Sequence, residues 1–145
     1  MNIFTPPPQK PLLIDGATHI DERGEIRFVN DALLSGIKRF YMISNKAVDI
    51  VRAWQAHKIE AKYFFAVDGA FLIGAVKLDD FENPSPDLSA ERFILNSDTP
   101  QILYIPPGYA NGIHALSEKN LMLIFSTLDL NESMADDYRF ASHLW

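Results

Sequence analysis

The sequence predicts an all-β fold, either a sandwich or a barrel, and two observations carry this prediction. From residue 37 onward, short runs rich in β-branched and aromatic residues follow one another, and most are bounded by Gly, Pro, Asn, Asp or Ser. Only one stretch, near the C-terminus, has a signal for the start of a helix. About seven to nine strands at this spacing, with little helix, favour packed antiparallel sheets or a closed barrel.

Length and composition indicate a single domain, which we expect to span residues 1–145. A hydrophobic share of 48% with 12% aromatic residues excludes a disordered chain. The net charge of −6 and the lack of long Lys/Arg runs argue against a nucleic-acid partner, although a local basic patch for a phosphorylated small ligand remains compatible. The sequence has no cysteine, which excludes disulfides, thiolate catalysis and zinc–thiolate sites.

The N-terminal segment does not resemble a targeting sequence. Residues 1–8 have neither a basic start nor an apolar centre, and no apolar run in the chain approaches the length of a membrane span. We therefore expect a cytoplasmic protein without a membrane partner. Residues 1–11 are predicted to form an extended arm, free or lying along a partner subunit, because they contain Pro6, Pro7, Pro8 and Pro11.

The expected elements follow in chain order. Residues 12–14 form a short apolar run that ends at the turn signal Asp15-Gly16, and residues 25–29 alternate as a strand after the polar turn 21–24. Residues 31–36 fit either a helical turn or a loop. Further strands are predicted at residues 37–44, 48–57, 59–67, 70–78, 92–96, 101–105 and 120–126.

Three connections have readable signals. Asp68-Gly69, between two apolar runs, is the strongest hairpin signal in the chain. Residues 81–90, with two prolines and two serines, are predicted to form a loop. Residues 133–136 fit a capping box, which predicts a short C-terminal helix at residues 134–141.

The strand predicted at residues 48–57 carries the first candidate site. A period of two puts Gln55 and His57 on one face and Arg52 on the other, so an amide and an imidazole point inward together if their face lines the interior. The alternative is that Gln55 lies on the surface and His57 is a hydrogen-bonded histidine at a strand end. Periodicity leaves both interpretations open.

A second candidate site follows the turn formed by Pro106, Pro107 and Gly108. Asn111 begins a new strand after this turn, and its amide is free to point into the interior. A simple turn explains the same residues.

Four stretches occur in a fixed order along the chain: Asp21-Glu22-Arg23-Gly24, Lys38-Arg39-Phe40-Tyr41, residues 52–58 and residues 106–112. In this order they resemble the motifs of cupin-fold dTDP-sugar enzymes, the WxcM-like sugar isomerases. The relatives are the dTDP-4-keto-6-deoxyglucose 3,4-ketoisomerases and the dTDP-4-dehydrorhamnose 3,5-epimerases. The ketoisomerases match better, because they carry Arg-Gly-x-His-x-His-Lys where this chain has residues 52–58. The resemblance implies a cupin-type jelly-roll β-barrel that forms a homodimer.

The resemblance also implies a substrate and a reaction. The substrate would be a dTDP-linked, or other nucleotide-linked, 4-keto sugar of deoxysugar or surface-polysaccharide biosynthesis. Gln55 and Asn111 stand where the family has histidines, and Phe125 stands where the epimerases have a tyrosine. The retained imidazole is His57, so the resemblance implies that His57 is the base of a one-face 3,4-ketoisomerisation rather than an epimerisation.

The remaining predicted site residues bind substrate. By resemblance, Arg23 and Arg52 would bind the diphosphate through charge-assisted hydrogen bonds. Tyr41, Gln55 and Asn111 would contact the sugar. An exposed loop arginine is the alternative for Arg23, and core packing is the alternative for Tyr41.

The resemblance argues against a metal or another cofactor. At the four positions where metal-binding cupins place their ligands, this chain retains one imidazole, which does not hold a divalent ion against water. Glu60 lies one residue away from the ligand position and does not restore the site. The four positions are Gln55, His57, Ala61 and Asn111.

Gln55 motivates a second hypothesis from another class. Because an amide cannot take a proton, the chain also fits a non-catalytic cupin that binds a nucleotide sugar as a regulatory or accessory module. The sequence leaves the nucleotide open among dTDP, UDP and CDP.

Overall fold

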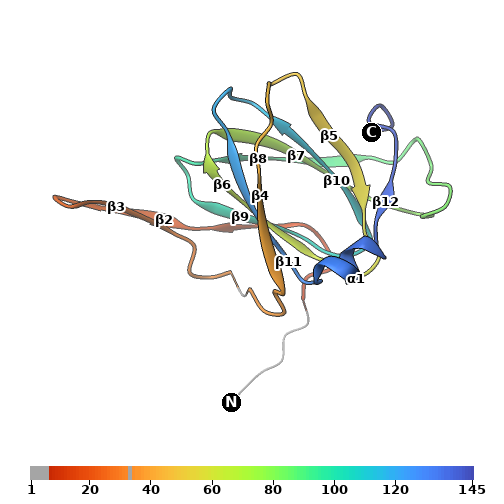
Figure 1. Ribbon diagram of the computed structural model, residues 1–145, viewed down its shortest axis with the longest axis horizontal. Helices are drawn as coiled ribbons and strands as arrows, with labels where there is room; N and C mark the ends of the chain where they lie inside the picture. The colour runs from red at the N-terminus through yellow and green to blue at the C-terminus, as the bar shows by residue number, and fades with distance from the viewer. Residues whose placement is uncertain (1–6, 33) are drawn as a thin grey trace, which may run out of the picture.

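The computed structural model describes residues 7–32 and 34–145, and within them the chain forms two five-stranded antiparallel sheets and a separate hairpin (Figure 1). The first sheet has the spatial order β1 (Leu12–Asp15), β9 (Gln101–Ile105), β6 (Lys62–Asp68), β11 (Leu121–Ser126) and β4 (Arg39–Ile43). The second has the order β12 (Tyr138–Arg139), β5 (Val51–Ala56), β10 (Tyr109–Ala115), β7 (Ala70–Lys77) and β8 (Ala90–Asn96). The hairpin consists of β2 (Ala17–Asp21) and β3 (Gly24–Phe28), and the helix α1 is Leu130–Met134.

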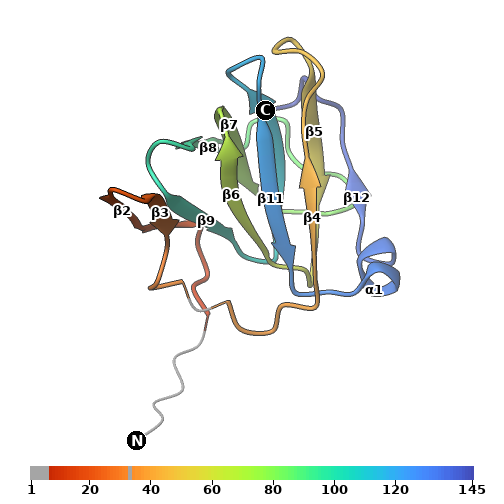
Figure 2. The ribbon, with the colours of Figure 1, turned by 60° about the vertical axis from the view of Figure 1, so that its left-hand side comes forward.

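The strands β4 to β11 are nested as in a jelly roll. β4 pairs with β11, β5 with β10, β6 with β9 and β7 with β8, and consecutive strands from β4 to β7 alternate between the two sheets. This pairing is that of a double-sheet jelly roll. Figure 2 shows the two sheets as facing layers. The predicted all-β, jelly-roll fold with a short C-terminal helix is confirmed.

The core lies between the inner faces of the two sheets. Inward-pointing residues of β6 to β11 form one continuous apolar cluster, and residues of β1 and β4 pack against it. Removing a large apolar side chain from water contributes about 1.5–3 kcal/mol, so these residues hold the layers together. The largest of them with almost no exposure are Phe64, Phe71, Ile73, Leu95, Leu103, Met122 and Ile124.

The hairpin predicted at Asp68-Gly69 is wrong. β6 and β7 belong to different sheets, so the turn carries the chain from one layer to the other. Gly69 has a φ of 75°, which explains the turn signal. Its carbonyl accepts a hydrogen bond from Ser97, and the next amide donates to Ser117 Oγ. The dipeptide indicates a tight reversal, but it does not determine which strands then pair.

The helix predicted at residues 134–141 is also wrong in its position. α1 begins after Asp129, which forms a reciprocal capping box with Glu132. Ser133, the predicted cap, lies within the helix. Asp136 accepts hydrogen bonds from backbone amides of another segment, and residues 138–139 form β12. Two consecutive cap patterns, at residues 129–132 and 133–136, occur in the sequence, and tertiary contacts select the first.

Other differences concern the N-terminal part. β2 was not predicted, and it pairs with β3 in a hairpin that projects from the sandwich (Figure 1). Residues 31–36 contain a turn at residues 35–36, and residue 33 lies outside the described residues. Residues 1–6 of the predicted arm also lie outside them. Residues 81–90 form the predicted loop up to Leu88–Ser89, before β8 begins.

Candidate active site

β5 departs from regular strand alternation where it borders the interior. Two of its residues, Ala53 and Trp54, lie opposite the single residue Gly112 of β10. This bulge shifts the side-chain alternation by one residue. Arg52 and Gln55 consequently line the same cavity, and the prediction that they lie on opposite faces is wrong.

A cavity of about 500 Å³ lies between the sheets, lined by residues of β4, β5, β6, β10 and β11 together with α1 and the C-terminal segment. Among the described lining residues, four are cationic and none is a carboxylate. Such a wall favours an anionic ligand. The polar lining residues are Arg39, Tyr41, Arg52, Gln55, Lys62, Asn111, Ser133 and Arg139.

The four cations differ in exposure. The side chain of Lys62 is 5% exposed and that of Arg39 is 25% exposed, whereas that of Arg139 is 71% exposed. Arg52 is also exposed, and its Nε donates to Oδ1 of Asn45 at 2.7 Å. The cavity thus has a deep ammonium group and guanidinium groups nearer to solvent.

An aromatic ring and two amides complete the polar wall. The centroid of the Tyr41 ring lies 5.9 Å from the Lys62 ammonium. Gln55 Oε1 accepts a hydrogen bond from Lys62 Nζ at 3.1 Å, and its Nε2 donates to Oδ1 of Asp137 at 3.0 Å, so both ends of this amide are oriented. Asn111 is 4% exposed and lies on the same wall.

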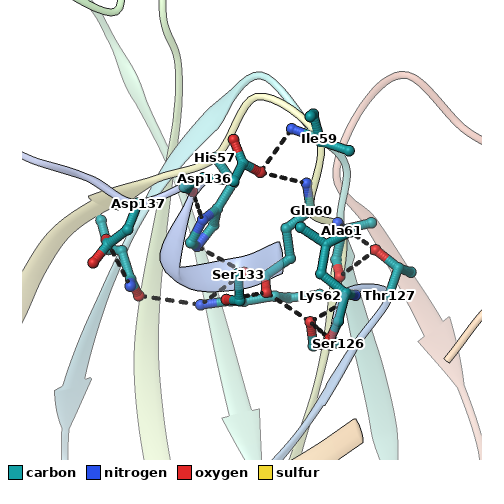
Figure 3. Close-up of polar contacts among 12 residues, drawn as sticks. His57, Ile59, Glu60, Ala61, Lys62, Ser126, Thr127, Ser133, Asp136 and Asp137 are labelled. Carbon is teal, nitrogen blue, oxygen red and sulfur yellow. Dashed lines mark hydrogen bonds and ion pairs between the residues drawn. The ribbon is translucent and has the colours of Figure 1, made fainter. Parts of the chain in front are cut away.

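A buried carboxylate lies behind Lys62 (Figure 3). Glu60 Oε1 accepts hydrogen bonds from the hydroxyl groups of Ser126 at 2.7 Å and Ser133 at 2.6 Å. Its Oε2 is 3.6 Å from Lys62 Nζ, and Arg39 Nη2 is 3.6 Å from Oε1. These contacts offset the desolvation cost of burying the Lys62 ammonium.

His57 lies beside this carboxylate, outside the residues that line the cavity. It is 3% exposed, with Nδ1 2.7 Å from the backbone carbonyl oxygen of Asp136 and Nε2 3.0 Å from Glu60 Oε2. The Asp136 carboxylate accepts the backbone N–H groups of Lys58, Ile59 and Glu60, each at 2.8 Å. The C-terminal segment therefore fixes the β5–β6 turn that carries both His57 and Glu60.

Burial and neighbouring charges have opposing effects on the pKa values of Glu60 and His57. Burial alone would raise the pKa of Glu60, but the Lys62 ammonium and the two serine hydroxyls outweigh it and lower the pKa of Glu60 overall. Burial lowers the pKa of His57, the Lys62 charge lowers it further, and Glu60 opposes both effects. Glu60 is therefore ionised near neutral pH.

Residues 10–143, nearly the whole chain, match the family described as FdtA: WxcM-like, C-terminal. The chain belongs to the WxcM-like family. No curated protein matches the sequence significantly.

Solved structures similar to this WxcM-like protein include nucleotide-sugar enzymes. The QdtA 3,4-ketoisomerase of Thermoanaerobacterium thermosaccharolyticum has a TM-score of 0.70 and 24% identity, covering 91% of this chain and 88% of that one. The rmlC epimerase of Mycobacterium tuberculosis has a TM-score of 0.75 and 17% identity, covering 98% of this chain and 74% of that one. The TDP-fucose-3,4-ketoisomerase WlaRA of Campylobacter jejuni has a TM-score of 0.68 and 16% identity, covering 92% of this chain and 92% of that one. At these identities the likeness shows a shared fold.

In this WxcM-like chain, the fold brings together most of the residues predicted from sequence. Arg23 is not among them, because it lies in the exposed β2–β3 turn, where its Nη2 is 2.6 Å from Oδ2 of Asp21. His57 is adjacent but lies behind the wall. The predicted residues that line the cavity are Tyr41, Arg52, Gln55 and Asn111.

Sequence reasoning missed Arg39, Lys62 and Arg139. For Lys62 a signal exists, since a lysine that alternates with the buried residues Phe64 and Ala66 must point inward. Arg39 similarly shares its strand face with Tyr41. Arg139 had no readable signal, because its two-residue strand depends on pairing with β5.

The described residues contain no group of three or more His, Cys, Asp or Glu side chains arranged to hold a metal ion. The expected independence from metal stays a prediction. Within the described part of the chain, no helix has the length and apolar character needed to cross a membrane.

Proposed function

We propose that this WxcM-like protein binds a dTDP-linked 4-keto-6-deoxyhexose and isomerises it by proton transfer next to the ketone, without a metal. The observation that carries the proposal is the cavity, whose described lining has four cations and no carboxylate. A nucleoside diphosphate is an anion that guanidinium groups bind through bidentate, charge-assisted hydrogen bonds.

The exposure of the cations suggests how the ligand is oriented. Arg52 and Arg139 are the exposed cations, so we assign the diphosphate to them. Lys62 is the most buried cation, so we assign the sugar ketone to its neighbourhood. Gln55 and Asn111 then offer amides to the sugar hydroxyls, and Tyr41 offers a ring face.

Similar proteins support the ligand class. QdtA has been solved with TDP and with TDP-4-keto-6-deoxyglucose, and the 3'-monoepimerase ChmJ of Streptomyces bikiniensis has been solved with dTDP. These three structures resemble the present one over at least 91% of its length. The ligands belong to those proteins, and we extend the class to this chain by proposal.

The proposed reaction moves one hydrogen from C3 to C4. Lys62 takes the C3 proton as it passes one of its own protons through Glu60 to neutral His57, so that the C3–C4 double bond forms and negative charge develops on O4 beside the ammonium. The O3 hydroxyl proton moves to O4, His57 returns its proton along the same path, and Lys62 delivers a proton to C4 on the same face while the C3–O3 double bond of the new ketone forms. A donor already placed at the developing oxyanion lowers the barrier of such a step.

The base role of His57 stays a prediction, and its imidazole reaches the cavity only through Glu60 and Lys62. His57 Nε2 is 3.0 Å from the carboxylate that also contacts Lys62. We therefore assign contact with the sugar to Lys62 and place His57 behind it.

Assembly and cellular role belong to the same proposal. We propose a homodimer, supported by exposed apolar residues on the outer face of the first sheet, such as Phe40 at 64% and Met42 at 57% exposure. We also propose a cytoplasmic role in deoxysugar or surface-polysaccharide biosynthesis, where such substrates are made. Arg23, on the projecting hairpin, remains a predicted diphosphate ligand in this assembly.

Ligand-observed NMR in deuterated buffer tests the function. We expect dTDP-4-keto-6-deoxyglucose to bind and to take up solvent deuterium next to the ketone. UDP- and CDP-linked 4-keto sugars serve as controls that determine the nucleotide preference.

The outcomes separate the hypotheses. Binding without deuterium uptake would replace the enzyme by the non-catalytic binding module. Failure of every nucleotide sugar to bind would overturn the proposal as a whole.

A further inference from the structure

Glu60 divides its two carboxylate oxygens between different partners. Oε1 accepts two serine hydroxyl groups, at 2.7 and 2.6 Å, and is held in place. Oε2 faces two cationisable groups, His57 Nε2 at 3.0 Å and Lys62 Nζ at 3.6 Å. Neither Oε2 nor His57 Nε2 makes a hydrogen bond within the described residues, so both of these contacts are electrostatic. Oε2 is thus shared by the His57 imidazole, which lies outside the cavity lining, and the Lys62 ammonium, which is part of that lining.

The tautomer of His57 follows from its other nitrogen. Nδ1 is 2.7 Å from the Asp136 carbonyl, which can only accept, so Nδ1 carries a proton. Nε2 then has a lone pair unless the ring carries a second proton. A lone pair facing a carboxylate oxygen at 3.0 Å is repulsive. The short contact therefore belongs to the imidazolium form of His57.

We propose that Glu60 is a positioning residue whose Oε2 turns from His57 to Lys62 when His57 loses its second proton. With the imidazolium present, Oε2 is engaged by His57, and the Lys62 ammonium is held mainly by Gln55. With neutral His57, Oε2 moves toward Lys62 and neutralises more of its charge. The proton on His57 thus sets the charge that the deepest cation presents to the cavity.

The charged groups around the pair define the pH range of the change. Arg39 on β4 and Lys62 on β6 both face Glu60, and Lys62 together with the two serine hydroxyls keeps it ionised. The Asp136 carbonyl faces His57 from the C-terminal segment, and Asp137 is bound to Gln55. Burial and Lys62 lower the pKa of His57 from its ordinary value of 6.5, so the second proton is lost as pH rises through a value below 6.5.

A bound anion should favour the imidazolium form, because that form adds one positive charge next to the cavity. This linkage rests on the proposed nucleotide-sugar function. By thermodynamic reciprocity, binding of dTDP then takes up a proton in mildly acidic buffer. The uptake is at most about one proton per dTDP, and it is largest when the pH lies between the pKa of His57 in the free protein and its higher pKa in the complex.

Imidazole ¹⁵N NMR of the ligand-free protein tests the positioning role without any substrate. We expect Nδ1 of His57 to remain protonated throughout, while Nε2 loses its proton as the pH rises. The chemical shift of Lys62 Nζ should change with the same midpoint. In Glu60→Gln the Lys62 resonance should no longer follow His57, and His57→Gln identifies the signals. If Glu60→Gln does not fold, the wild-type titration still decides. A Lys62 Nζ chemical shift that does not change while His57 titrates in the wild type would overturn the inference.

Calorimetry of dTDP binding in buffers of different ionisation enthalpy tests the linkage. Wild type should take up a proton, and His57→Gln should not. Asp68→Asn, which removes a surface carboxylate 3.5 Å from Lys119, is the matched control and should behave as wild type. Equal uptake in wild type and His57→Gln would overturn the linkage. Absence of dTDP binding would overturn the proposed function, and the NMR titration would still decide the role of Glu60.

Discussion

At the scale of single residues, Lys62 shows how a charged side chain is kept inside a β-sandwich. It lies on the inward face of β6, next to the core residue Phe64, with only 5% of its side chain exposed. A buried ammonium without partners would be strongly destabilising, but here Glu60 and Gln55 compensate its charge and hydrogen-bonding capacity. A charge that is stabilised in this way and faces a cavity is a candidate for chemistry.

Lys62→Met should separate catalysis from binding. We expect turnover of dTDP-4-keto-6-deoxyglucose to fall about 100-fold or more, because removing one preorganised donor from an oxyanion site costs about 10²–10³ in rate. The affinity for dTDP should change less than about tenfold, since Arg52 and Arg139 would still bind the diphosphate. Steady-state kinetics and calorimetry measure the two quantities.

The control for this substitution is Lys119→Met, whose side chain is 89% exposed on the surface. It should change neither turnover nor affinity. An unchanged turnover in Lys62→Met would remove Lys62 from the mechanism, and the melting temperature of each variant shows whether it is folded.

The predicted and observed sites differ for specific physical reasons. Gln55 and Asn111 could be found because their motifs are local, and Tyr41 because it is the last residue of a recognisable tetrapeptide. Arg52 was predicted correctly as a site residue but on the wrong strand face, since a bulge is not visible in a period-two pattern. The buried contacts of His57 depend on Asp136, which lies 79 residues away in the chain.

At the scale of elements, the connections between strands depend on contacts that the local sequence does not encode. Periodicity predicted most strands of both sheets, often with the ends displaced by a few residues. The turn at residues 106–108 indicated β10, which begins at Tyr109 rather than at Asn111. Asp68-Gly69 predicted a tight turn correctly and its strand pairing wrongly, because pairing depends on which neighbours cover each edge. The backbone of the loop before β11 lies directly against Gly69. Because this loop is distant from Gly69 in the chain, the residues around Gly69 do not reveal the contact.

Two glycines provide a matched test of this turn. Gly69 and Gly36 have nearly equal φ values of 75° and 74°, but a Cβ on Gly69 would lie 2.2 Å from the Lys119 carbonyl oxygen, whereas a Cβ on Gly36 would meet nothing within 4 Å. Gly36→Ala should cost about 1–2 kcal/mol from the left-handed backbone alone. Gly69→Ala should cost about 1–3 kcal/mol more, because the backbone must move.

Chemical denaturation of both variants measures the difference in the free energy of unfolding. Equal losses would mean that the loop containing Lys119 moves freely and does not hold the turn between the sheets.

At the scale of the whole molecule, charge and apolar surface are distributed unevenly. The chain has a net charge of −6, yet the described lining of the cavity between the sheets is cationic. The outer face of the first sheet carries Phe40, 64% exposed, whose ring lies 6.3 Å from that of Phe125. A separate groove of about 690 Å³ on the same side includes Leu12, Tyr63 and Tyr104. Apolar surface of this extent is typical of a protein interface.

Phe40→Glu should weaken the proposed homodimer, because it places a charge on this outer face. We expect sedimentation velocity to show a shift from dimer to monomer at micromolar protein concentration. Ile94→Glu, on β8 of the other sheet and 59% exposed, is the matched control and should leave the dimer intact. A wild-type protein that sediments as a monomer would contradict the proposal directly.

Asp136, which accepts three backbone amides of the β5–β6 turn, has a consequence for biosynthesis. The ribosome releases this turn long before it releases Asp136, which follows every strand of the two sheets except β12. The sandwich can therefore collapse co-translationally around a turn that is still unanchored, and His57 and Glu60 acquire their geometry only when the last part of the domain emerges. Ribosome-bound chains halted before this point should have a formed core and no affinity for nucleotide.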